Sequence, residues 1–295
     1  MNDSDTSQRF LLNDSAIRGQ WTLLDSSYQT VLAKHDYPLE VQALLGEMMA
    51  AAVLLTATLK FDGSLTIQAR GEGPVHLITV ECTDDNHLRA VARWKGDTTG
   101  LDFKALLGDA VLAITITPDK GERYQGIVPL SGDNLAECLE FYFSQSEQLR
   151  TRIWLHQGNN RAAGMLLQVL PYNSGTEIDP EQQNEDWSRL SMLADTLTAD
   201  ELLNLDSPTL LHRLFHEEDV LLFPPEPIDF RCTCSRERTA DALVRIGREE
   251  LDSLLAERGN IEVTCQFCNQ LYIFDAVDVA MLFQQNPAPD SGRRH

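Results

Sequence analysis

The chain is short of positive charge. It carries 24 lysine and arginine side chains against 45 aspartate and glutamate side chains, which gives a formal net charge of -21. A protein that wraps nucleic acid needs a surplus of cations to neutralise phosphates, so this composition argues against a nucleic-acid partner. An anionic membrane surface would repel the same charge.

Long apolar runs are also missing. The longest, Met48–Leu59, covers twelve residues, fewer than the roughly 20 that a membrane-spanning helix needs. The first ten residues have neither the basic start nor the apolar stretch of a secretory signal. Because 43% of the 295 residues are hydrophobic, the chain can still build a real core. We therefore expect a soluble, cytoplasmic protein with no membrane partner.

The common catalytic signatures are absent as well. The sequence has no Ser/His/Asp pattern, no H-E-x-x-H and no Walker motif. Gly71-x-Gly73 is followed by Pro74, which removes a backbone donor, so this stretch predicts a turn and not a phosphate loop. These absences favour a protein that is not an enzyme.

Cysteine is scarce, but its placement is informative. Six cysteines are too few for a disulfide scaffold in a chain of this length. Four of them form two tight pairs, Cys232-x-Cys234 and Cys265-x-x-Cys268, with thirty residues between the pairs. Four thiolates make the tetrahedral set that zinc prefers in closed, structural sites. The spacing therefore predicts one zinc ion bound by Cys232, Cys234, Cys265 and Cys268.

Two roles for such a site stay open at this point. The zinc ion could simply hold a small C-terminal block together, because the block has little apolar core of its own. Alternatively, the site could be a switch: thiolates are the species that oxidants attack, and each pair is close enough in sequence to form its own disulfide. Structural zinc sites usually separate paired cysteines by two to four residues, whereas one residue separates Cys232 from Cys234.

The negative charge is concentrated in the middle of the chain. Residues 1–174 have a net charge of -7, residues 175–230 a net charge of -12, and residues 231–295 a net charge of -2. The turn-like stretch Pro171–Gly175 marks the first boundary and Pro224–Pro227 the second. We therefore expect three parts: a core domain over 1–174, an acidic helical linker over 175–230, and a zinc-binding domain over 231–295. Because its charges repel one another, the linker should be only marginally stable and should need to dock an apolar face.

The first part has the pattern of a mainly antiparallel α+β domain. Leu39–Leu59 predicts a buried helix, and Asp133–Glu147 predicts a second helix. Alternating or β-branched residues predict six strands. These are Leu65–Ala69, Val75–Val80, His87–Arg93, Val111–Thr117, Tyr124–Val128 and Arg152–His156.

The other two parts carry mostly helical signals. In the linker, Thr198 and Glu201 form a capping box, and Ser207-Pro208 is typical of a helix start with Ser207 as the cap. In the last part, two short strands, Ile261–Thr264 and Leu271–Phe274, flank Cys265 and Cys268. Three helices should surround them. They run from Ser235 through Val244, over Glu249–Arg258 and from Asp275 through Phe283.

Several separated stretches of the sequence match the motifs of one known family. They are Leu59–Gly63, Gly71–Pro74, Ile116–Pro118, Gly121–Gly126, Tyr142–Leu149, Gly164–Gln168, Arg213–Glu218, Cys232–Arg238 and Cys265-x-x-Cys268. Through these motifs, which occur in the family's order and include all four family cysteines, the sequence resembles the Hsp33 family over essentially its whole length. That family comprises the redox-regulated holdase chaperones of bacteria. Two positions depart from the pattern: Ala110 stands where glycine is common, and no glycine follows Cys268.

The resemblance implies a mechanism. In the reduced protein the four thiolates hold zinc and the linker packs on the core domain. Oxidation forms the Cys232–Cys234 and Cys265–Cys268 disulfides, releases zinc and unfolds the C-terminal block. The linker then melts, and the exposed apolar surfaces of the linker and core domain bind unfolding proteins under oxidative stress without ATP. A homodimer accompanies activation.

Two other function classes compete with the chaperone. Cys265-x-x-Cys268 could belong to a thiol–disulfide oxidoreductase, although such motifs normally lie at a helix N-terminus and this one lies between strands. A zinc-ribbon binding protein is the other alternative, which the net charge disfavours. The remaining candidates are weak: the lone Cys82 and Cys138 are typical of buried apolar positions, and His212 and His216 have no carboxylate at a ligand-like spacing.

Overall fold

The computed structural model describes residues 4–13, 15–59, 62–170 and 179–285. The predicted turn at Pro171–Gly175 and the first few residues of the predicted linker lie outside these ranges. The chain separates into two compact units, Met1–Arg231 and Cys232–His295.

One antiparallel sheet, sheet A, is built from distant parts of the first unit. Its strand order is β10-β1-β2-β9-β8, and β11 pairs with the other end of β1. The β2–β9 pairing joins Ile17 to Val169, so the two ends of the core region meet at the centre of the sheet. The strands are β1 (Thr6–Leu12), β2 (Ile17–Leu24), β8 (Thr151–Gly158), β9 (Arg161–Val169), β10 (Val220–Leu222) and β11 (Glu226–Pro227).

The second sheet, sheet B, has the order β12-β5-β4-β3-β6-β7. Its pairs are antiparallel except for the short edge strand β12, which runs parallel to β5. All residues of sheet B except β12 come from one stretch of the chain. The strands are β3 (Gly63–Gly71), β4 (Val75–Thr83), β5 (His87–Trp94), β6 (Ala110–Pro118), β7 (Tyr124–Val128) and β12 (Asp229–Phe230).

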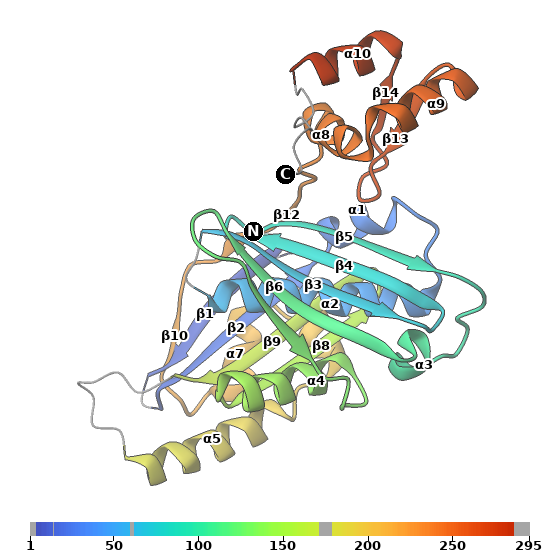
Figure 1. Ribbon diagram of the computed structural model, residues 1–295. Coiled ribbons are helices and arrows are strands. Elements are labelled where there is room, and N and C mark those ends of the chain that lie inside the picture. Colours follow the sequence, from blue (N-terminus) through green and yellow to red (C-terminus); the bar gives the residue numbers. More distant parts are fainter. Residues whose placement is uncertain (1–3, 14, 60–61, 171–178, 286–295) are drawn as a thin grey trace. The chain divides into compact units, whose positions relative to one another are not determined.

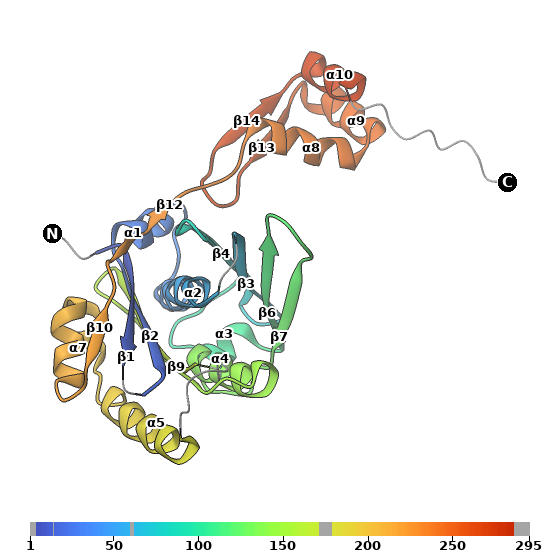
Figure 2. The same cartoon turned by 90° about the vertical axis from the view of Figure 1, so that its left-hand side faces the viewer.

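Helix α2 (Leu39–Thr58) lies between the two sheets, and Figure 2 shows it end-on. The apolar side chains of α2 are spread around its whole circumference, so the helix has no continuous polar face to turn to solvent. Most of its side chains are buried. By length and composition alone α2 could cross a bilayer, but 72% of that apolar window is buried inside the protein. It is therefore the central core helix, as Leu39–Leu59 predicted.

Three helices of the acidic segment cover the outer face of sheet A (Figure 1, Figure 2). They are α5 (Pro180–Ala194), α6 (Ala199–Asn204) and α7 (Ser207–Phe215). Their apolar side chains share one buried core with the outward-facing residues of β1, β2 and β9. The sheet side of this core consists of Phe10, Leu12, Ile17, Trp21, Leu23, Ala163, Met165, Leu167 and Val169.

Shorter helices close the remaining sides of the first unit. Helix α4 (Leu135–Tyr142) continues into a π-helical turn, η1 (Phe143–Glu147), and together they fill the predicted range Asp133–Glu147. The sequence did not predict α1 (Ser26–Leu32) or α3 (Phe103–Leu107).

The second unit is a strand hairpin with three helices. Its helices are α8 (Arg236–Ile246), α9 (Arg248–Arg258) and α10 (Ala276–Gln285), and its hairpin pairs β13 (Ile261–Thr264) with β14 (Leu271–Phe274). Ser235 caps α8 by accepting a hydrogen bond from the Arg238 backbone N–H, as expected. The buried core is small and contains Ala240, Leu243, Leu251, Ile261, Phe274 and Val279.

The α+β class, with antiparallel sheets and helices, is confirmed, and several details differ from the prediction. Strands β1, β2 and β9 were missed, because β2 and β9 are buried on nearly every residue and so lack the alternation that marks a half-exposed strand. The capping box of Thr198 and Glu201 is present. The cap of α7, however, is Asp206 and not Ser207: its carboxylate accepts the Thr209 N–H, which places Ser207 at the first helical position.

Candidate metal centre

The two cysteine pairs are positioned by different elements of the second unit. Cys232 and Cys234 lie in the extended segment before α8, and Ser235, which caps α8, follows directly. Cys265 and Cys268 lie in the turn between β13 and β14. The Cys265 N–H donates to Gln270 O at 2.9 Å, and the Asn269 N–H donates to Cys265 O at 2.9 Å, which closes the turn.

The turn also explains why glycine is dispensable after Cys268. Asn269 has a φ of 61°, in the left-handed region that glycine adopts without cost. Asparagine is one of the few other residues that tolerate this conformation, because its short polar side chain bonds locally. The departure from the family pattern therefore leaves the turn intact.

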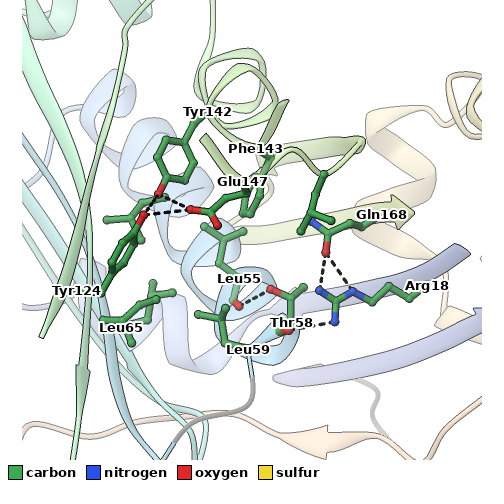
Figure 3. A pocket seen from close by; sticks show the side chains of 13 residues that line it. Arg18, Leu55, Thr58, Leu59, Leu65, Tyr124, Tyr142, Phe143, Glu147 and Gln168 are labelled. Atoms are coloured by element: carbon green, nitrogen blue, oxygen red, sulfur yellow. Dashed lines mark hydrogen bonds between the residues drawn. The ribbon is translucent and has the colours of Figure 1, made fainter. Parts of the chain in front are cut away.

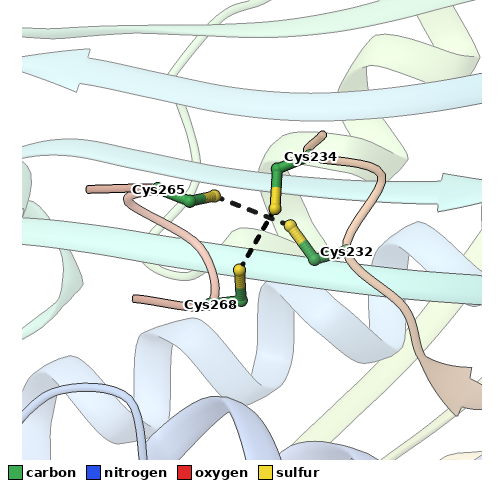
Figure 4. Close-up of side chains that lie close together, drawn as sticks. All are labelled: Cys232, Cys234, Cys265 and Cys268. Carbon is green, nitrogen blue, oxygen red and sulfur yellow. Dashed lines mark hydrogen bonds between the residues drawn. The ribbon is translucent and has the colours of Figure 1, made fainter. Parts of the chain in front are cut away.

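The four sulfur atoms converge on one point (Figure 4). Their ligand atoms all lie within 4.8 Å of one another, with 3.6 Å between the Sγ atoms of Cys232 and Cys265 and 3.4 Å between those of Cys234 and Cys268. A tetrahedron with zinc–sulfur bonds of about 2.3 Å has edges of about 3.8 Å, so the sulfur positions suit such an ion. All four are free thiols, and these two sulfur–sulfur contacts each join one cysteine pair to the other. The cluster can therefore hold a metal ion.

Hydrogen bonding favours the thiolate at one of these cysteines. Burial opposes ionisation of Cys234, but a hydrogen bond from Tyr272 Oη at 3.2 Å and the neighbouring thiols outweigh it and lower the pKa of Cys234 to about 7. Burial raises the pKa of Cys232 and brings that of Cys268 to about 12. A bound dication would favour the ionised form of all four, because metal ions bind the thiolate.

An arginine at the start of α8 ties the parts of the cluster together. Arg236 Nη1 donates to Ile273 O at 2.7 Å, its Nη2 lies 2.8 Å from Asp278 Oδ2, and its guanidinium lies 4.3 Å from the centre of the Phe274 ring. These contacts link the Cys232–Cys234 segment to β14 and α10. They are partly exposed and the buried core is small, so the unit gains much of its stability from any metal that it binds.

The other sequence candidates lie elsewhere. Cys82 and Cys138 are buried in the core around α2, and burial raises the pKa of Cys82 to about 12 and also raises that of Cys138. The rings of His212 on α7 and of His216, its C-cap residue, meet edge to face with centres 6.3 Å apart. Within the described ranges, only the four C-terminal cysteines form a group of three or more side chains that could ligate one metal ion.

The acidic helices α5–α7 are docked on sheet A. Two arginines at or just before the start of β8 contact α5 and its C-cap: Arg150 Nη1 donates to Asn184 Oδ1 at 2.6 Å, and Arg152 Nη2 lies 2.6 Å from Asp195 Oδ1. Such exposed pairs contribute about 0–1 kcal/mol each, so the buried apolar core must supply most of the docking energy.

One residue of this centre, Tyr272, was not predicted from the sequence. Tyr272 contributes the hydrogen bond to Cys234, and the available signal was its position on the strand that leaves the cysteine turn. Tyrosine is common in β-strands, so the sequence alone does not mark Tyr272 as part of the site. Its contact with Cys234 becomes visible only in the geometry of the β13–β14 hairpin.

The first unit is an α+β domain with acidic helices over sheet A, and the second is a small unit with four clustered thiols that could hold a metal ion. Comparison with known families identifies the group. The chain belongs to the Hsp33 protein family, whose model matches residues 5–275.

Individual relatives agree with this assignment. The chain is 54% identical over 283 residues to the 33 kDa chaperonin of Ectopseudomonas mendocina, covering 95% of each chain. It is 54% identical over 286 residues to the 33 kDa chaperonin of Pseudomonas aeruginosa, covering 96% of each. These relatives are named as chaperonins, and the family is one of chaperones and not of enzymes.

A solved structure shows the same fold. The crystal structure of the 33 kDa chaperonin (heat shock protein 33 homologue) from Thermotoga maritima superimposes with a TM-score of 0.81 at 21% sequence identity. It covers 95% of this chain and 98% of that chain.

Proposed function

We propose that this chain is a redox-regulated, ATP-independent holdase that binds unfolding proteins under oxidative stress in the cytoplasm. The observation that carries the proposal is the convergence of four free thiols, all within 4.8 Å of one another, in a unit that has little other core. A unit held together in this way loses its fold when the thiols react, because the ligands and the structure are lost together.

Zinc is the metal we propose for the reduced state, with one ion per chain on Cys232, Cys234, Cys265 and Cys268. Four thiolates suit zinc, which prefers soft ligands and tetrahedral geometry. When bound, zinc supplies the cross-link between the segment before α8 and the β13–β14 turn. Arg236 and Tyr272 orient the two sides of the site.

Oxidation then acts on the pairs that are adjacent in sequence. In our proposal Cys232 bonds to Cys234 and Cys265 bonds to Cys268. Each pair of thiolates gives two electrons to a peroxide, which is reduced to water, and zinc leaves because its ligands are consumed. Forming these disulfides consumes all four ligands and breaks the contacts of Cys232 with Cys265 and of Cys234 with Cys268. The second unit therefore unfolds as the disulfides form.

The client-binding surface that we propose is the apolar core between sheet A and helices α5–α7. Residues 175–230 carry a net charge of -12, so these helices are marginal once their support is lost. Undocking uncovers large side chains such as Phe10 and Trp21 on the sheet together with the apolar faces of the helices. Exposed apolar surface of this kind binds unfolded chains without nucleotide hydrolysis. We further propose that the oxidised protein is a homodimer.

The test compares reduced, zinc-loaded protein with protein treated with peroxide under mild warming. Zinc release, loss of four thiols and suppression of client aggregation should rise together. A matched sample of the Cys82→Ser variant should behave identically, because that thiol is buried in the core of the first unit and is not one of the four clustered thiols. Turnover of a disulfide substrate without client holding would instead indicate the oxidoreductase.

A further inference from the structure

A cavity of about 300 Å³ lies in the first unit, where both sheets meet the C-terminal end of α2. It has no part in the metal centre or in the docking of α5–α7. Its wall is mainly apolar and includes Leu55 and Leu59 from the end of the helix region, Leu65 and Ile116 from sheet B, and Phe143 from η1. This size is at the lower end for small-molecule sites.

One half-buried cation lines this cavity. Arg18 on β2 donates from Nε to Gln168 Oε1 at 3.1 Å and again from Nη2 to the same oxygen, and its Nη1 donates to Thr58 O at 3.0 Å. Across the part of the chain that the structure describes, its bonded partners are neutral oxygens, and no carboxylate forms an ion pair with it. Burial lowers the pKa of Arg18, and the nearby Arg9 adds to this effect.

A guanidinium has five N–H donors, and these contacts use three of them. Two donors and a full positive charge therefore remain for a ligand. A partly desolvated cation without a counter-ion is costly, and an anion bound beside it would relieve that cost.

A hydroxyl network lies toward the other end of the cavity (Figure 3). The Tyr142 and Tyr124 hydroxyls donate to Glu147 Oε1 at 2.9 and 3.2 Å. Glu147 itself is exposed, so water screens its charge, whereas the charge of Arg18 is screened less. The wall here is a π-helical turn followed by Gln148 at a φ of 54°, two uncommon conformations that proteins use at functional sites more than elsewhere.

We propose that this cavity binds an amphiphilic monocarboxylate, with the carboxylate on Arg18 and the hydrocarbon chain against Leu55, Leu65 and Ile116. The charge of the half-buried arginine selects an anionic head group, and the apolar wall selects the chain. Since the site joins β2, α2, β9 and sheet B, an occupant should stabilise the folded first unit in proportion to its occupancy.

The test uses the full, reduced, zinc-loaded chain and decanoate below its micellar concentration. Decanol and decylammonium serve as neutral and cationic probes of the same chain length. We expect saturable decanoate binding at one site by calorimetry, together with a rise in the unfolding temperature of the first unit. Decanol should bind at least tenfold more weakly, and decylammonium should not bind.

Two variants locate the site. Arg18→Met should weaken decanoate at least tenfold while leaving decanol affinity unchanged, a pattern that general loss of structure would not produce. Ile116→Trp fills the cavity and should abolish binding of both probes. Arg70→Met, which removes an exposed arginine from β3, is the control and should change neither. Absence of saturable decanoate binding, equal affinity for decanol, or full affinity in the Arg18→Met variant would each overturn the proposal.

Discussion

Replacing Leu190 by glutamate tests whether undocking of the acidic helices is sufficient for client binding. Leu190 lies on α5 with no exposed surface, in the core that α5–α7 share with sheet A. Losing a buried leucine costs about 2 kcal/mol. Burying an unpaired carboxylate costs at least about 3 kcal/mol more. The docked state should therefore lose on the order of 5 kcal/mol.

Little remains to oppose that loss. The ion pairs that help to hold α5, such as Arg152 with Asp195, are exposed and contribute about 1 kcal/mol or less. A helix of 15 residues is marginal by itself, and this one lies in the most acidic part of the chain. We therefore expect the Leu190→Glu variant to undock α5 while the second unit keeps its metal.

The assay measures amide hydrogen exchange, zinc content and suppression of client aggregation under reducing conditions. Protection should fall across α5–α7 and stay unchanged in β13 and β14, and the variant should hold clients without oxidation. Met192→Glu is the matched control, because it adds the same charge to the same helix at a side chain that is 65% exposed. If the Leu190→Glu variant loses protection and still fails to hold clients, release of these helices is not the activating step.

Three further predictions follow from the thiols and from one buried carboxyl group. Cys232→Ser should abolish tight zinc binding, as measured by metal content after dialysis, whereas Cys82→Ser should retain one zinc per chain. In metal-free reduced protein, the rate of alkylation of Cys234, followed by peptide mapping, should rise with pH around a midpoint near 7. The Tyr272→Phe variant should have a higher midpoint, because the thiolate loses its hydrogen-bond donor. An unchanged midpoint would contradict the role of Tyr272 in stabilising the thiolate. Burial raises the pKa of Glu47 from 4.5 to about 7, so between these pH values the folded state holds a proton that the unfolded chain releases. Binding of this proton favours the folded state. The resulting stability is fully present below about pH 4.5 and is lost as the pH rises through 7. Glu47→Gln should remove that loss and raise the free energy of unfolding at pH 8 by about 1–3 kcal/mol. The gain is smaller than the full pKa shift would give, because the Glu47 side chain is partly exposed. Urea titrations at pH 5 and pH 8 measure the difference.

The sequence predicted features that depend on local pattern. The buried helix α2, five of the strands in sheet B and the capping box of Thr198 all come from short-range periodicity or spacing. The two cysteine pairs also carry a strong local signal, because the two cysteines of each pair lie within three residues of one another.

What the sequence did not predict depends on pairing between distant residues. β2 and β9 lie about 145 residues apart and are covered on both faces, so neither alternation nor a turn marks them as partners. The cavity beside Arg18 likewise needs five or more separate elements to exist. No local pattern in the sequence could have joined Arg18 to Ile116.

The outer face of sheet A has a consequence for association between copies of this chain. Side chains such as Trp21 and Met165 have the size and burial of permanent core residues, yet their outer cover is a set of short, charged helices. Any state without that cover would expose the apolar outer face of sheet A to solvent, and large exposed apolar patches are typical of interaction sites. In the function that we propose, a second copy of this chain and an unfolded client would compete for that face, so the concentration of the protein itself would set the balance between self-association and client binding.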